Sequence, residues 1–108
     1  MEVYKMRIRN ITSAHGNKIA NQFIIEDGNK VYFQSYNSMI ACIDYNTKTI
    51  TIGEDYNYSV TTGKYRNKFF DDMGLYELAN IKALEHAIKQ GYIVINNHKI
   101  NVVYDANL

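Results

Sequence analysis

Two stretches of the chain carry aromatic, hydroxyl and amide side chains more densely than a β-sheet needs. They cover residues 32–41 (YFQSYNSMIA) and residues 58–65 (YSVTTGKY). Neither stretch contains a recognisable catalytic arrangement. Their side chains instead suit contact with another molecule, because tyrosine supplies a large contact area, loses little entropy and ends in a polar group.

Four tyrosines stand at predicted strand ends or in loops, where we do not expect all of them to be buried. These are Tyr36, Tyr45, Tyr56 and Tyr58. Glu54 and Asp55 directly precede the last two, and this grouping predicts a patch of interface hot-spot residues. The alternative is that some of these rings close the rim of a small core.

Residues 61–64 (TTGK) resemble the end of a phosphate-binding loop, whose glycines let backbone amides surround a phosphate. Tyr58 occupies the position of the first glycine and Tyr65 that of the metal-binding hydroxyl, so the match fails and nucleotide hydrolysis is not expected. A weaker hypothesis is that helix-start amides, two threonine hydroxyls, Lys64 and Arg66 hold one phosphate or carboxylate. An ordinary capped helix with a solvated basic face is the favoured reading.

Residues that could serve metal or acid–base chemistry are scattered. The potential metal ligands are His15, Cys42, His86 and His98. None has the close spacing that makes a zinc site readable, although a site assembled from distant positions stays open. Asp71 and Asp72 are adjacent and diverge by roughly 100° on a helix, so they cannot share a proton or a metal. We therefore expect no enzyme activity, no metal and no cofactor.

Basic residues fall in two groups that could join into one stripe. These are Lys5, Arg7 and Arg9 on a predicted strand, and Lys64, Arg66 and Lys68 on a predicted helix. Interleaved with tyrosines, such a stripe could contact phosphates and stack bases. Acidic residues surround the same helix: Asp44, Glu54, Asp55, Asp71, Asp72 and Glu77. A mixed solvated surface is favoured over a nucleic-acid site.

Length and composition place the chain among ordinary globular proteins. Its 108 residues predict a single domain over 1–108, and a 46% apolar share is enough for a core. A formal net charge of +1 gives no overall attraction to nucleic acid or membranes. The single cysteine cannot form an internal disulfide, and no stretch approaches a membrane span. We therefore expect a cytoplasmic protein with no membrane partner.

Alternation of apolar and polar residues predicts strands in the first half of the chain. Tyr4, Met6 and Ile8 form the expected buried side of the first strand. Residues 22–26 and 30–36 flank Asp27-Gly28, a hairpin signal that places Ile24 opposite Val31 and Phe23 opposite Tyr32. Both faces of this hairpin then carry apolar groups. Such a sheet needs cover on both sides, from helices, a partner or another copy of the chain.

The remaining elements follow from local signals. Residues 39–43 and 48–52 predict a second hairpin that turns at residues 45–47, with Ile50 and Ile52 inward. A helix follows from Thr61 or Thr62 to about residue 72, with a threonine as N-cap. A turn over residues 75–79 and a helix running from an Asn80 N-cap to a Gly91 stop come next. A hairpin over residues 92–95 and 100–104 completes an α+β fold with a mainly antiparallel sheet.

The strings YFQSYNSMIA and YSVTTGKYRNKFF resemble a family of short proteins encoded by bacteriophages and prophages of low-GC Gram-positive bacteria, catalogued as a domain of unknown function. The resemblance covers residues 6–70 and, loosely, the Asn80–Gly91 helix. Residues 71–79 and the C-terminal hairpin depart from the pattern. The resemblance implies a small, cofactor-free phage protein that acts in the bacterial host cytoplasm.

This context predicts stoichiometric inhibition of a host defence protein, most concretely an anti-CRISPR protein that binds a Cas9-type effector. The predicted partner-binding residues are Glu54, Asp55, Tyr56, Tyr58, Lys64 and Arg66. One alternative is a nucleic-acid-binding accessory protein that uses the basic stripe. Another is a structural phage component that self-associates, as a homodimer for example, through the two-sided apolar hairpin.

Overall fold

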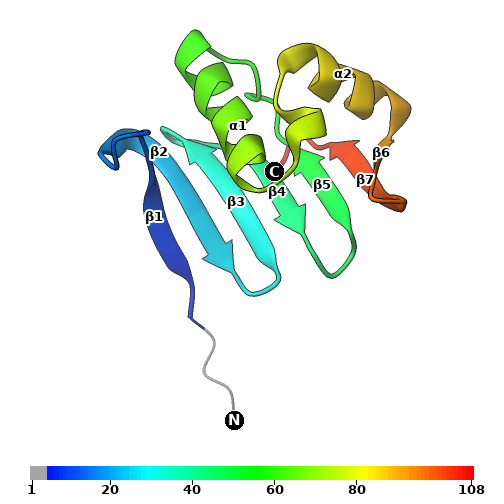
Figure 1. The fold of residues 1–108 in the computed structure, drawn as a ribbon, viewed down its shortest axis with the longest axis horizontal. Coiled ribbons are helices and arrows are strands. Elements are labelled where there is room, and N and C mark those ends of the chain that lie inside the picture. Colours follow the sequence, from blue (N-terminus) through cyan, green and yellow to red (C-terminus); the bar gives the residue numbers. More distant parts are fainter. Residues whose placement is uncertain (1–4) are drawn as a thin grey trace.

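The computed structural model describes residues 5–108, which form one seven-stranded sheet and two α-helices (Figure 1). The elements are β1 (Arg7–Thr12), β2 (Lys18–Asp27), β3 (Lys30–Ser35), β4 (Ser38–Asp44), β5 (Thr49–Ile52), α1 (Val60–Asp72), the short 3₁₀ helix η1 (Tyr76–Leu78), α2 (Ile81–Gln90), β6 (Tyr92–Ile95) and β7 (His98–Tyr104). The predicted α+β fold and its order of elements are confirmed. Within residues 5–108, neither helix has the length and apolar character that crossing a bilayer requires.

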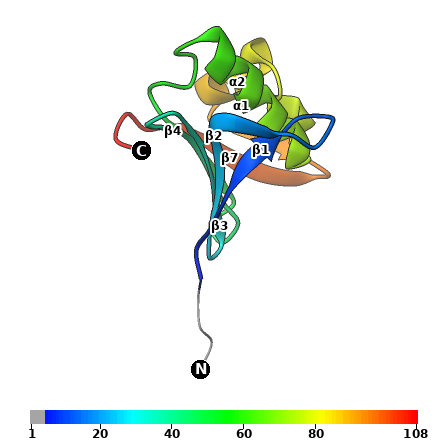
Figure 2. The same cartoon turned by 90° about the vertical axis from the view of Figure 1, so that its left-hand side faces the viewer.

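The strands run in the spatial order β1-β2-β3-β4-β5-β7-β6, and all neighbours are antiparallel except β5 and β7. Both helices cover the same face of the sheet and lie toward one end of it (Figures 1 and 2). The turns between β2 and β3 and between β4 and β5 extend beyond the helices at the other end (Figures 1 and 2). The helices therefore lie over the end of the sheet where β3 turns into β4, and we call this the crowded end.

The β2–β3 hairpin forms as predicted, but its register is shifted by two residues. Ile24 lies opposite Phe33 rather than Val31, and Phe23 opposite Gln34 rather than Tyr32. The turn is Gly28-Asn29, with a positive φ of 64° at Gly28, rather than Asp27-Gly28. A shift of two residues keeps every side chain on its predicted face, so the apolar groups on both faces are confirmed.

The first strand is less buried than its alternating pattern predicts. Ile8 is 62% exposed and Met6 is 57% exposed, and the buried apolar residue nearby is Ile11. Tyr4, the third residue of the predicted pattern, lies outside the described residues. The prediction of a buried side at Met6 and Ile8 is wrong because β1 is an edge strand, and Ile8 faces away from the helices.

The closing hairpin is confirmed, and its turn is Asn96-Asn97, both with positive φ (50° and 65°). Asparagine tolerates this left-handed region better than most residues. β7 then inserts beside β5 in parallel, opposite Ile50 and its neighbours, and leaves β6 at the edge of the sheet. The local signals in the sequence did not predict this parallel pair.

The helices begin and end at capping residues. The N-cap of α1 is Ser59, whose Oγ accepts a hydrogen bond from the Thr62 amide, so the predicted threonine cap is wrong by two or three residues. The N-cap of α2 is Asn80 as predicted, and Gly91 ends this helix with φ of 90°. The predicted turn between the helices is η1.

The core lies between the sheet and the helices. Its largest contributors are Ile24, Phe33, Ile50, Ile52, Val102, Phe69, Phe70 and Leu84. The rings of Phe33 and Phe69 stack with centroids 5.5 Å apart and join β3 to α1. Each fully buried side chain of this size contributes about 1.5–3 kcal/mol to folding. The inward orientation predicted for Ile50 and Ile52 is confirmed.

The outer face, meaning the face of the sheet away from the helices, also carries apolar side chains. Paired positions on six neighbouring strands form one row across it: Ile8, Ile25, Tyr32, Cys42, Thr51 and Val103. Ile25 and Cys42 in the middle of the row are buried by their neighbours, whereas Ile8 and Val103 at its ends are exposed. Burial raises the pKa of the Cys42 thiol, so it stays protonated at neutral pH.

Candidate functional site

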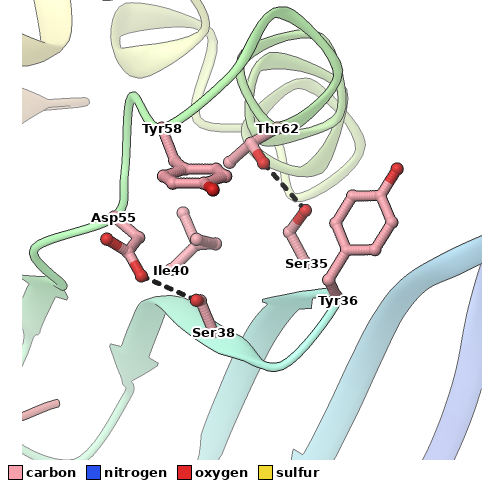
Figure 3. Close-up of a pocket in the computed structure, with 7 residues that line it drawn as sticks. All are labelled: Ser35, Tyr36, Ser38, Ile40, Asp55, Tyr58 and Thr62. Carbon is pink, nitrogen blue, oxygen red and sulfur yellow. Dashed lines mark hydrogen bonds between the residues drawn. The ribbon is translucent and has the colours of Figure 1, made fainter.

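The two sequence stretches rich in tyrosine and hydroxyl groups meet at the crowded end of the sheet. They enclose a cavity of about 300 Å³ (Figure 3). The residues that line it are Ser35, Tyr36, Ser38, Ile40, Asp55, Tyr58 and Thr62. They come from the end of β3, the turn that follows it, the start of β4, the loop after β5 and the first turn of α1. We refer to this site as the rim cavity.

Hydroxyl groups fix the start of α1 to the sheet on one side of the rim cavity. Ser35 Oγ and Thr62 Oγ1 share a hydrogen bond of 3.0 Å, and both residues are buried. Ser59 Oγ donates to Thr62 Oγ1 at 3.2 Å and accepts from the Thr62 amide at 3.1 Å. The first turn of the helix is thereby held in place, and the Thr62 hydroxyl is already engaged by the protein.

Asp55 forms the opposite side of the cavity and is held by the β3–β4 turn region. Its Oδ2 accepts a hydrogen bond of 2.7 Å from Ser38 Oγ (Figure 3). The Tyr58 amide donates to the Asp55 carbonyl at 3.1 Å, and the Gly53 amide donates to the Ile40 carbonyl at 2.8 Å. A Cβ at residue 53 would collide with the backbone carbonyl of Met39, so glycine allows this close approach.

Two tyrosines stand at the mouth of the cavity. Tyr58 is 78% exposed and Tyr36 is 47% exposed. In Figure 3 the ring of Tyr58 lies over Ile40, and Tyr36 lies beyond Ser35. Tyr36 has a φ of 54°, which is uncommon for a bulky residue and costs conformational energy. Its amide donates to the Asn21 carbonyl at 2.7 Å, which holds it in that conformation.

Tyr56 is not among the residues that line the rim cavity, and it fastens the loop to both helices. Its hydroxyl donates to Glu85 Oε2 on α2 at 2.8 Å, and its carbonyl accepts a hydrogen bond of 2.6 Å from Arg66 Nη1 on α1. The hydrogen bond to Glu85 and partial burial raise the pKa of Tyr56. Tyr56 therefore positions the loop, whereas its neighbours Asp55 and Tyr58 line the cavity.

Arg66 is only 1% exposed, and its Nη2 also donates to Asn67 Oδ1 at 3.0 Å. Burial lowers the pKa of the guanidinium, an effect that nearby Glu85 opposes. Since Arg66 and Thr62 are both turned into the protein, the predicted phosphate cradle at the helix start does not form. The predicted continuous basic stripe also loses its central member, because Arg66 does not reach the surface.

The other predicted basic residues are dispersed among carboxylates. Lys64 is exposed, with its Nζ 5.3 Å from the centroid of the Tyr65 ring. Lys68 Nζ lies 3.3 Å from Asp72 Oδ2. On β1, Arg9 Nη2 lies 4.0 Å from Glu26 Oε1. Five of the six residues predicted to contact a partner are at least partly exposed, and Arg66 is the buried one. The five are Glu54, Asp55, Tyr56, Tyr58 and Lys64.

Four polar or charged side chains of the described residues are buried, and two of them line the rim cavity. The four are Gln22, Ser35, Thr62 and Arg66. Gln22 lies opposite Ser35 on the neighbouring strand, and within residues 5–108 neither its Oε1 nor its Nε2 has a hydrogen-bond partner. Buried polar groups without partners are rare in folded proteins and mark places where packing is not the only constraint.

The scattered potential metal ligands do not meet. Within the part of the chain that the structure describes, no three histidine, cysteine, aspartate or glutamate side chains come close enough to hold a metal ion. Cys42 belongs to the outer face, and His15, His86 and His98 are exposed.

Sequence reasoning singled out Asp55 and Tyr58 but assigned no role to Ser35, Ser38 or Ile40. The available signal was the density of hydroxyl and aromatic residues in the two stretches, since four lining residues come from the first stretch and two from the second. The sequence does not show which residues of the two stretches contact each other in the fold. The Ser35–Thr62 hydrogen bond joins residues that are 27 positions apart.

Comparison with known proteins places most of the chain in one family. The sequence model of a family of unknown function, DUF8033, matches residues 6–85. No curated protein matches the chain, and no solved structure does.

Proposed function

We propose a function for this chain, which belongs to the DUF8033 family, from the surface around the rim cavity. The protein is a non-enzymatic inhibitor that acts by stoichiometric binding of another protein. The observation that carries the proposal is the exposure of Tyr36 and Tyr58 at the mouth of a cavity that also holds a carboxylate, Asp55. Interfaces derive most of their binding energy from a few such aromatic and charged residues around a pocket.

The way this surface is held supports binding over catalysis. The loop that carries Asp55 and Tyr58 is tied to β4, α1 and α2 through Ser38, Arg66 and Glu85. A surface fixed before binding loses little conformational entropy when a partner docks, which improves affinity. The serine and threonine hydroxyls of the cavity bond to one another or to Asp55, and no histidine or thiol is among the described lining residues. This is the pattern of a recognition surface.

The partner that we propose is a nuclease of the host defence system, and the finer assignment is a phage-encoded anti-CRISPR protein that binds a Cas9-type effector. Its support is the resemblance of the sequence to phage and prophage proteins, together with the carboxylates Glu54 and Asp55 beside the tyrosines. Nucleic-acid-binding surfaces are rich in Lys and Arg. An acidic and aromatic patch complements such a surface and blocks DNA from it.

The test uses a purified, guide-loaded Cas9-type effector. We expect the protein to co-elute with the effector in a one-to-one complex and to suppress cleavage of target DNA. Tyr58→Ala should weaken binding at least about tenfold, because truncation of a hot-spot tyrosine typically has an effect of this size. Tyr45→Ala is the matched control, since Tyr45 is 56% exposed at the opposite end of the sheet. A protein that does not co-elute with the effector and does not inhibit cleavage would contradict the proposal.

The outer face favours a second candidate function, self-association as a structural component. Ile8 and Val103 are exposed at the ends of an apolar row that no helix covers. Burial of this row against a second copy would remove it from water. Analytical ultracentrifugation of the protein and of an Ile8→Lys, Val103→Lys variant tests this candidate. A concentration-dependent dimer that the variant loses supports it, and a monomer at high concentration contradicts it.

A further inference from the structure

We propose that the rim cavity is a receptor for the guanidinium group of an arginine side chain, presented by the partner protein. This inference rests on the proposed function, because it names the group on the partner that the same surface recognises. It can nevertheless be tested without the partner. The charge of the cavity, its hydrogen-bonding groups and its shape each favour a guanidinium.

The charge of the cavity selects a cation. Asp55 is the one acidic residue of the described lining, no lysine, arginine or histidine belongs to that lining, and Glu54 next to Asp55 is exposed. Arg66, the buried cation of α1, does not line the cavity and directs its Nη1 to the Tyr56 carbonyl. An anionic ligand would meet the Asp55 carboxylate unfavourably. The Thr62 amide, which could otherwise attract an anion, is already bonded to Ser59 Oγ.

The hydrogen-bonding groups around the cavity are mainly acceptors. A carboxylate offers about four acceptor positions, and Ser38 Oγ occupies one position on Asp55. Each serine or threonine hydroxyl has two acceptor lone pairs. Thr62 Oγ1 accepts from Ser59 Oγ and shares a hydrogen bond with Ser35 Oγ, so Ser35 Oγ keeps at least one lone pair for a ligand. A guanidinium carries five N–H donors and no acceptor. It therefore fits a site in which a carboxylate and hydroxyl oxygens converge from opposite sides.

The shape distinguishes arginine from lysine. Tyr36 and Tyr58 offer aromatic faces at the mouth, and Ile40 lies beneath Tyr58 (Figure 3). A planar guanidinium stacks on aromatic rings, and its methylene chain packs against an apolar residue such as Ile40. The compact, strongly hydrated ammonium of lysine gains less from such a site. A volume of about 300 Å³ lies at the lower end of the range of ligand pockets and can hold a single side chain.

The experiment titrates small probes into the ¹⁵N-labelled protein and follows backbone amide signals by NMR. The probes are N-acetyl-arginine methylamide, the citrulline analogue, which has nearly the same shape but no charge, and the lysine analogue. We expect saturable shifts from the arginine probe at residues 35–38 and 55–62. The lysine analogue should bind more weakly and the citrulline analogue should give no saturable shift.

Two variants test the role of Asp55. Asp55→Asn should weaken binding of the arginine probe at least about tenfold, because a hydrogen bond between charged groups is replaced by a neutral one. Asp71→Asn is the matched control, since Asp71 is an exposed carboxylate at the far end of α1, and it should leave binding unchanged. The amide spectrum of each variant shows at once whether the fold is intact.

Several outcomes would overturn this inference. They are the absence of saturable shifts, equal shifts from arginine and citrulline, full binding by a folded Asp55→Asn variant, and a neutral monosaccharide that shifts the same residues where arginine does not. The proposed function fails separately. If the arginine probe binds but the effector does not, the pocket assignment stands and the proposed function fails. If the effector binds equally well to the Asp55→Asn variant, the proposed function stands and the pocket assignment fails.

Discussion

Tyr56 joins three parts of the molecule through two polar atoms, so its hydroxyl is a sensitive point for mutation. Tyr56→Phe removes the 2.8 Å hydrogen bond to Glu85 and keeps the ring. We expect the free energy of unfolding to fall by about 0.5–1 kcal/mol, because the bond is solvent-accessible. Urea denaturation at pH 7 measures the change. Glu85→Gln is a useful comparison, since an amide oxygen can still accept from the tyrosine.

The same hydrogen bond has a predictable pH dependence. The folded protein raises the pKa of Tyr56 above its ordinary value near 10, mainly through Glu85. The protonated hydroxyl is therefore the form that the folded state favours. Its contribution is complete below about pH 10 and is lost as the pH rises through the folded pKa. The stability difference between wild type and Tyr56→Phe should shrink above pH 10, and a constant difference would contradict this assignment.

Arg66 is a structural residue, although its type suggests a surface cation. Arg66→Ala should lower the free energy of unfolding by about 2–4 kcal/mol, because it leaves a cavity and deprives the Tyr56 carbonyl of its 2.6 Å hydrogen bond. Lys68→Ala, on the same helix, should change it by less than about 0.5 kcal/mol, since the Lys68–Asp72 pair is partly exposed. Equal effects in urea denaturation would contradict the assigned role of Arg66.

At the scale of the element, α1 depends on its N-cap for both stability and the site. Ser59→Ala removes the acceptor for the Thr62 amide, and we expect a loss of about 1 kcal/mol. Ser59→Asp should retain most of the stability, because aspartate is an equally good cap. Thermal unfolding followed by circular dichroism gives both values. A Ser59→Asp variant as unstable as Ser59→Ala would show that the hydroxyl contact to Thr62, not the cap, dominates.

The elements themselves could largely be read from the sequence, because their signals are local. The Asn80 cap, the Gly91 stop and the Asn96-Asn97 turn each lie within a few residues of the backbone that they shape. Two local errors have physical causes. The turn after β2 has Gly28 at its first position, where the prediction had Asp27. The N-cap of α1 is Ser59, where the prediction had one of the two threonines that follow it. In both cases neighbouring residues have similar propensities, for the turn in the first case and for the helix N-cap in the second.

The assembly of the elements was much harder to predict. Pairing of β5 with β7 joins Ile50 to Val102 across two helices, and no local pattern marks such a partner. The rim cavity depends on the same kind of information, since Ser38 meets Asp55 and Ser35 meets Thr62 only after folding. Burial of Arg66 could not be predicted either, because its acceptor is a backbone carbonyl that any residue type would supply.

For the whole molecule, the distribution of charge argues against nucleic-acid binding. The net charge is +1, Arg66 is buried, and Lys68 and Arg9 each lie near a carboxylate. We expect no retention of double-stranded DNA in a gel-shift assay at about 150 mM salt, where non-specific binding depends on many phosphate contacts. Retention that weakens steeply with salt, and that Lys64→Ala together with Lys68→Ala abolishes, would contradict this expectation and support the accessory-protein alternative.

The loop between β5 and α1 separates the groups that build it from the groups that it presents. Gly53, Tyr56 and Arg66 hold its backbone, whereas Asp55 and Tyr58 project their side chains into or over the cavity. Substitution of Tyr58, which is 78% exposed, should therefore cost the scaffold little, whereas substitution of Asp55 also removes the hydrogen bond from Ser38. A change at residue 58 can thus alter the chemistry of this surface while the fold beneath it is kept.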